Sequence, residues 1–198
     1  VTLSERGYIK CIPTTTYRLQ HRGGKGVRGQ TTREGDALRH IMVTDNHDML
    51  LFFTNTGRMY KTKGYELPPD TSRATRGMPL VQALNLRPDE SVQAILSVAS
   101  LQEEGDLLLA TRMGEIKRMA LSSLINIRTN GINAMDLEPG DELVSMRLCS
   151  DTDDVIMVSS QGMSIRFPAA HVRRSSRVAG GVRGIRLKDD DRVVAMDV

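Results

Sequence analysis

A fourfold internal repeat constrains the fold of this chain more than any other feature. Each copy places two apolar stretches around a short polar turn that contains a glycine, with a period of about 50 residues. The turn glycines are Gly7, Gly57, Gly114 and Gly162, and a Ser or Thr stands three residues before each of them. This pattern predicts a β-hairpin in every repeat, with glycine at a turn position that requires a positive φ.

Two further sequence motifs, or phrases, recur after each hairpin. One is a glycine-containing phrase, such as residues 76–81 and 180–187, and the other is an acidic turn before an alternating strand, such as residues 90–96. Each repeat therefore offers about four short strands and no convincing helix. The segment from Ala120 to Ile127 could form a helical turn, but its short length and Asn126 favour a loop.

Four-stranded units that recur every 50 residues or so predict an all-β, propeller-like array of four blades. An open β-solenoid is the second choice. The repeats span residues 1–43, 44–98, 99–148 and 149–198 and form one domain, with no linker between them. The chain starts with Val1 and opens directly into a strand pattern, so we expect it to be a fragment of a longer polypeptide.

A cationic glycine-rich segment lies in the first repeat, at the place of the second phrase. Residues 20–26 read Gln-His-Arg-Gly-Gly-Lys-Gly, and residues 18–33 contain five Lys or Arg and no acid. Glycines allow close approach to a bulky partner, and Arg and Lys suit phosphate oxygens. We call residues 18–28 the cationic loop. It lacks the spacing of a nucleotide P-loop, and a solvated mobile loop remains the alternative from this segment alone.

Charge is segregated along the chain although the formal net charge is only +3. Residues 171–188 carry six Lys or Arg and no acid, whereas acids gather at 151–154 and 189–191. One or more cations also follow each hairpin turn: Lys10, Lys61, Lys117 with Arg118, and Arg166. In a radial array these cations would form a basic track, as expected of a nucleic-acid binder, unless they are ordinary outward strand positions.

Enzyme and metal motifs are absent from the sequence. The four histidines are scattered, and Cys11 and Cys149 belong to no Cys or His cluster, so we expect reduced thiols and no metal site. No signal peptide and no apolar run near 18 residues is visible, which predicts a cytoplasmic location and no membrane span.

The segment from Gln20 to Gly26 resembles the box motif of the gyrase A family. Residues 1–10, 73–77 and 181–187 are also similar to that family, so the resemblance covers essentially the whole chain. It implies the C-terminal DNA-wrapping domain, a β-pinwheel that usually has six blades, whereas four repeats are visible in this chain. His21 departs from the usual second basic residue of the box.

The resemblance also implies a function. Such a domain binds double-stranded DNA around its perimeter, bends it and wraps it, so that a type II topoisomerase can introduce negative supercoils. The domain would perform no catalysis alone and hold no cofactor, since ATP and Mg²⁺ act elsewhere in the enzyme. Its partners would be the rest of the A subunit and the B subunit in an A2B2 assembly, and its location the cytoplasm, associated with the nucleoid.

Phosphate contact is the expected mode of binding, because the chain offers no recognition helix and aromatic residues are only 4% of it. The box residues expected to contact DNA are Gln20, His21, Arg22, Gly23, Gly24, Lys25, Gly26 and Arg28. The expected track comprises Lys10, Arg58, Lys61, Lys63, Arg73, Arg76, Lys117, Arg118, Arg166, Arg173, Arg174 and Arg183. No residue is predicted to be catalytic or to bind a metal.

Two alternatives fit the same repeat. The C-terminal domain of the topoisomerase IV A subunit shares it, but typically lacks a good box. A propeller that serves only as a protein-interaction scaffold is the other, and the acid-free basic segments argue against it.

Overall fold

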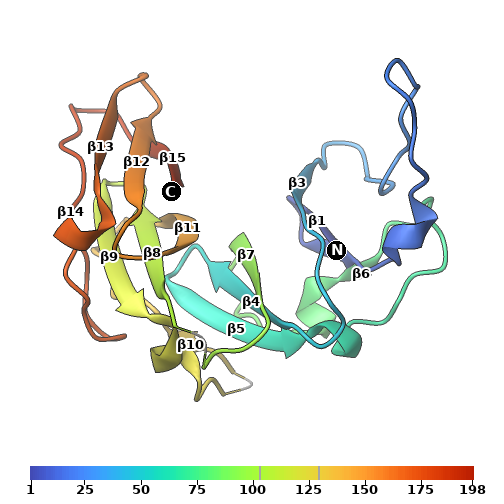
Figure 1. Cartoon of the computed structure of the whole chain (residues 1–198), viewed down its shortest axis with the longest axis horizontal. Helices are drawn as coiled ribbons and strands as arrows, with labels where there is room; N and C mark the ends of the chain where they lie inside the picture. Colours follow the sequence, from blue (N-terminus) through green and yellow to red (C-terminus); the bar gives the residue numbers. More distant parts are fainter. Residues whose placement is uncertain (103, 129) are drawn as a thin grey trace.

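Four antiparallel sheets form the fold of this chain. The computed structural model describes residues 1–198 except 103 and 129. The described residues form strands and short 3-10 turns, without an α-helix. The sheets, named blades 1 to 4, follow one another along an arc in chain order, and blades 1 and 4 stand at its two ends (Figure 1). The prediction of an all-β array of propeller-like blades is confirmed.

The spatial order of the strands in each blade differs from their order along the chain. Blade 1 contains, from edge to edge, β3 (Leu38–Ile41), β1 (Thr2–Ser4), β2 (Tyr8–Lys10) and β6 (Met78–Pro79). Blade 2 contains β7 (Val92–Val98), β4 (Met49–Thr54), β5 (Arg58–Lys63) and β10 (Ile132–Asn133). Blade 3 contains β11 (Leu143–Cys149), β8 (Asp106–Thr111), β9 (Glu115–Ala120) and β14 (Val182–Arg183). Blade 4 contains β15 (Val193–Asp197), β12 (Asp154–Ser159) and β13 (Ser164–Pro168).

Short 3-10 turns connect these strands. They are η1 (Thr14–Thr16), η2 (Gly64–Glu66), η3 (Leu80–Gln82), η4 (Leu121–Leu124) and η5 (Ala169–His171). The segment from Ala120 to Ile127, expected to be a loop, thus contains one 3-10 turn. Within the described residues, no helix is long and apolar enough to cross a membrane.

Repeats 2, 3 and 4 each contribute one strand, here called an exchanged strand, to the sheet of the preceding repeat. The two-residue strands β6, β10 and β14 belong to repeats 2, 3 and 4, but each completes the sheet of the preceding repeat. Blade 3, for example, ends on β14, where Val182 pairs with Ile116 and Arg183 with Glu115. Blade 4 has three described strands rather than the expected four. The boundaries of the sequence repeats and those of the blades therefore differ by one strand.

The hydrophobic cores lie between blades. On β4, Leu50 and Phe52 pack into a core shared with blade 1, whereas Leu51 and Phe53 pack into a core shared with blade 3. Successive side chains of a strand point to opposite faces, so a strand between two cores must be apolar at every position. The continuous apolar runs of β4 and β8 follow from this arrangement.

Candidate nucleic-acid interface

The cationic loop projects from blade 1, and the Gln20 side chain bridges it. Residues 18–28 are all exposed, and the loop extends beyond the sheet (Figure 1). The Oε1 atom of Gln20 accepts a hydrogen bond from the amide of Gly26 at 3.0 Å. A Cβ atom at Gly24 would lie only 2.8 Å from that Oε1 atom, and Gly26 has a φ of +69°. Glycine at both positions therefore lets Gln20 close the loop without strain.

Buried hydrogen bonds join the base of this loop to repeat 2. The Gln30 side chain is buried, accepts a hydrogen bond from the Thr2 hydroxyl at 2.7 Å and donates to the carbonyls of Tyr8 and Arg76. The amide of Thr31 donates to the Thr75 carbonyl at 3.2 Å. The cationic loop is thus tied to blade 1 and to residues 75–76 at once.

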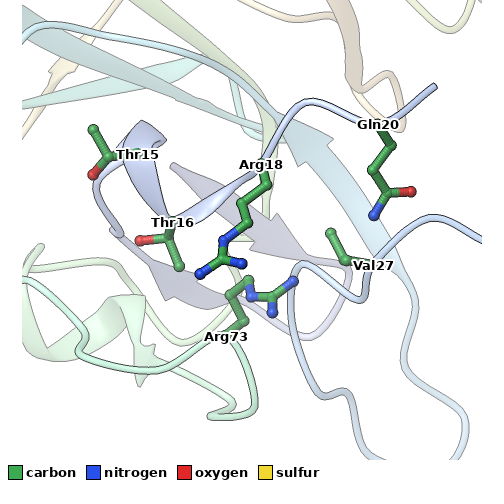
Figure 2. A pocket seen from close by; sticks show the side chains of 6 residues that line it. All are labelled: Thr15, Thr16, Arg18, Gln20, Val27 and Arg73. Carbon is green, nitrogen blue, oxygen red and sulfur yellow. The ribbon is translucent and has the colours of Figure 1, made fainter.

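Two adjoining hollows lie where the cationic loop meets repeat 2. The first, of about 420 Å³, is lined by Thr15, Thr16, Arg18, Gln20, Val27 and Arg73 (Figure 2). Figure 2 shows the side chains of Arg18 and Arg73, which come from different repeats, lining this same hollow. The second, of about 400 Å³, shares Val27 and Arg73 with the first and adds Arg28. Three arginines therefore surround the junction of two repeats.

Lys10 and Lys117 are buried and their ammonium groups bind backbone carbonyls, so their contact with DNA stays a prediction. The Nζ atom of Lys10 donates to the carbonyls of Gly29, Arg73 and Thr75 at 3.4, 2.6 and 3.1 Å. The Nζ atom of Lys117 donates to the carbonyls of Ala134, Arg177 and Ala179 at 2.8, 2.8 and 2.7 Å.

Both side chains therefore act as links between repeats. Each lysine lies three residues after its turn glycine and holds a loop of the next repeat by that loop's carbonyl oxygens. Burial disfavours the charged amine, so it lowers the pKa of Lys10 and lowers the pKa of Lys117 to about 8.

Arg118 is also buried, and its place in the track likewise stays a prediction. Its guanidinium pairs with Asp106 and Asp151 and donates to the Ala169 carbonyl. Arg58 is engaged in a similar way: its side chain is 11% exposed, forms an ion pair with Glu90 and donates to the Asn133 side chain. Both guanidinium groups are therefore engaged within the protein.

The other track residues lie at or near the surface. Arg166, Arg173, Arg174 and Arg183 are exposed, whereas Lys61, Lys63, Arg73 and Arg76 are half-buried. Arg166 pairs with Asp154, and Arg174 pairs with Asp106. The guanidinium carbon of Arg76 lies 5.0 Å from the centre of the Tyr8 ring. Their contact with DNA stays a prediction, as does that of the box residues.

Arg28 and Arg73 at the junction belong to the predicted site, but several of its other residues do not. Gln30 and Thr31 follow the box, and Thr15, Thr16 and Arg18 precede it. Lys10 and Lys117 both lie three residues after a turn glycine. This recurrence at one strand position was a usable signal that the two lysines have the same surroundings in their blades. Within the described part of the chain, no cluster of three or more His, Cys, Asp or Glu residues could hold a metal ion.

Comparison with known proteins identifies the family. The family model described as DNA gyrase C-terminal domain, beta-propeller, matches residues 1–45, 48–99, 105–150 and 153–198. The chain belongs to this family. A DNA gyrase A subunit from Dehalogenimonas lykanthroporepellens is 43% identical over 198 residues, which is all of this chain and 24% of that relative. The chain thus spans about a quarter of the length of that protein.

Solved structures of this family and of a related one have the same fold. A DNA gyrase A C-terminal domain superposes with a TM-score of 0.79 at 26% identity, covering 98% of this chain and 62% of that one. A DNA topoisomerase IV C-terminal domain superposes with a TM-score of 0.77 at 22% identity, covering 98% and 59%. The second likeness establishes the fold alone.

Proposed function

We propose that this domain binds duplex DNA through its phosphates, bends it and wraps it. In this way it would support negative supercoiling by a type II topoisomerase. The observation that carries the proposal is the exposed cationic loop, in which Gln20 and its glycines present Arg22 and Lys25 to solvent. Membership of the gyrase C-terminal domain family supports it.

The fold favours phosphate contact over base reading. The described residues contain no α-helix that could enter a major groove. Exposed arginines on blades 3 and 4, such as Arg173 and Arg183, would extend the contact away from the cationic loop. Bending DNA costs free energy, and contacts at both ends of the bent path would offset that cost.

The remaining steps of supercoiling belong to the parts of the enzyme outside this chain. We propose that the domain works with the rest of the A subunit and with the B subunit in an A2B2 assembly, in the cytoplasm at the nucleoid. It would bind no cofactor itself, with ATP and Mg²⁺ acting on the other parts.

A topoisomerase IV C-terminal domain is the second candidate, and the shared fold supports it. The intact Arg-Gly-Gly-Lys-Gly core at residues 22–26 favours gyrase.

A salt titration of duplex binding tests the proposal. Binding to a 30-bp duplex of arbitrary sequence should weaken steeply between about 50 and 200 mM salt. The reason is that log K falls with log salt by about 0.9 for each phosphate contacted. Duplexes of different sequence should bind alike. Affinity that stays constant over this range, or that depends on one sequence, would contradict the proposal; a scaffold protein would show no binding at all.

A further inference from the structure

The first hollow of the interface brings together two arginines from different repeats. Arg18 comes from the start of the cationic loop and Arg73 from a loop of repeat 2, and the hydroxyl-bearing Thr15 and Thr16 line the same hollow. Among the described residues, neither arginine forms an ion pair with a carboxylate. Asp70, close in sequence, instead accepts hydrogen bonds from the Ser72 amide and the Thr75 hydroxyl.

Buried bonds fix the position of this pair. Lys10, 2% exposed, donates to the carbonyl of Arg73 at 2.6 Å and to that of Gly29, which directly follows the cationic loop. The Arg73 backbone and the base of the loop are therefore held by the same ammonium group. Lys10 is a positioning residue, since it touches the hollow only through the backbone that it holds.

Two guanidinium groups that line one hollow, with no carboxylate paired to either among the described residues, attract an anion into it. Arginine forms paired N–H to oxygen bonds with phosphate, and such charge-assisted bonds are about twice as strong as neutral ones. The two threonine hydroxyls can donate to further phosphate oxygens.

We propose that Arg18 and Arg73, with Thr15 and Thr16, bind one phosphate group of the DNA backbone across the boundary between repeats 1 and 2. This inference rests on the proposed function and extends the DNA-binding site beyond the box. One shared phosphate would hold the cationic loop against repeat 2, so the loop and the next blade would bind the same point of the duplex.

A double-mutant cycle tests this sharing. Arg18→Ala, Arg73→Ala and the double variant are titrated with the same 30-bp duplex over a range of salt. When two side chains bind the same phosphate, the losses of binding free energy caused by their single substitutions do not add in the double variant. The fold loss of the double variant should therefore fall well below the product of the two single losses, and its salt slope should drop by about 0.9, the value for one phosphate.

Two controls make the result specific. Arg18→Ala combined with Arg173→Ala, an exposed arginine on another repeat, should lose affinity as the product of the single losses. Arg73→Lys, which keeps the charge without the planar fork, should lie between the parent and Arg73→Ala. Unfolding midpoints of all variants should match that of the parent, since the side chains of Arg18 and Arg73 pack no core.

The outcomes separate the two proposals. If the parent shows no salt-dependent duplex binding, the proposed function fails and this inference fails with it. If the parent binds but the Arg18 and Arg73 losses multiply, with a slope change of about 1.8, the two arginines bind separate phosphates and only this inference is overturned. Variants that bind as tightly as the parent would overturn it equally.

Discussion

At the scale of single residues, the same type of side chain has two different roles in this domain. Lys117 is 1% exposed and bound to three carbonyl oxygens, whereas Lys61 is half-buried and, among the described residues, donates only to the Ile125 carbonyl. The two lysines lie three and four residues after their turn glycines. Because side chains alternate along a strand, these two offsets place the lysines on opposite faces of their sheets.

We therefore expect Lys117→Met to destabilise the fold. Methionine fits the buried space but leaves three carbonyl oxygens without their charged donor, which should cost about 3 kcal/mol of unfolding free energy. Urea unfolding followed by circular dichroism measures this as a lower midpoint with an unchanged slope.

Lys61→Met is the matched control for this change. It removes one hydrogen bond near the surface, so its effect should stay within about 0.5 kcal/mol. Equal losses for the two variants would show that the carbonyl contacts of Lys117 contribute nothing particular to stability.

At the scale of secondary-structure elements, the hairpins were predictable and the exchanged strands were not. The glycine turns with apolar flanks at Gly57 and Gly114 specify β4–β5 and β8–β9 locally. Strands β6, β10 and β14 pair through only two residues each, and their partners lie in another repeat. A repeat pattern does not say which neighbouring sheet such a short strand completes.

Identical sequence also gives different elements in this chain. The tetrapeptide Gly-Val-Arg-Gly occurs at residues 26–29 and 181–184. The later copy contains β14, paired with β9, whereas the earlier copy lies in the cationic loop outside the described strands. Tertiary context, in this case the open edge of β9, decides between strand and loop.

The exchanged strand β6 depends on a glycine that no other residue can replace without strain. Gly77 has a φ of +84°, and a Cβ atom there would lie 2.2 Å from the Ile9 carbonyl oxygen of β2. Gly77→Ala should therefore cost about 3 kcal/mol, from the left-handed backbone and the forced separation of β6 from β2. Thermal or urea unfolding measures the loss.

Gly7→Ala separates the two causes in the same blade. Gly7 has a similar φ of +79°, but nothing lies within 4 Å of the Cβ position. This variant should lose only the backbone contribution, about 1 kcal/mol. If Gly77→Ala were no worse than Gly7→Ala, close strand contact would not explain the glycine at position 77.

At the scale of the whole molecule, sequence predicted the cationic loop but not its neighbours. The charges and glycines of the loop are contiguous in sequence, so the pattern reveals them directly. Arg18 and Arg73 line one hollow because β6 of repeat 2 pairs with β2 of blade 1, which places repeat 2 next to the loop. This neighbourhood is not visible in the sequence. The side chains of Lys10, Lys117 and Arg118 contact the next repeat, which equal radius in a radial array did not reveal.

The position of the cationic loop leads to a prediction about DNA topology. The triple change Arg22→Ala, Lys25→Ala and Arg28→Ala removes charge from one projecting loop at the end of the arc. A bent duplex stores elastic energy, and a contact at the end of its path prevents it from straightening. The variant should therefore lose most of the linking-number change that the parent produces, when nicked circles are religated in the presence of either protein.

The matched control removes three exposed arginines from blades 3 and 4: Arg166→Ala, Arg173→Ala and Arg183→Ala. Both triple variants lose three charges, so simple duplex affinity should fall by comparable factors at a given salt concentration. The control should keep more of the linking-number change, because the cationic loop still holds the end of the path. Equal topological loss in the two variants would mean that total charge governs wrapping, and that the cationic loop has no special place in it.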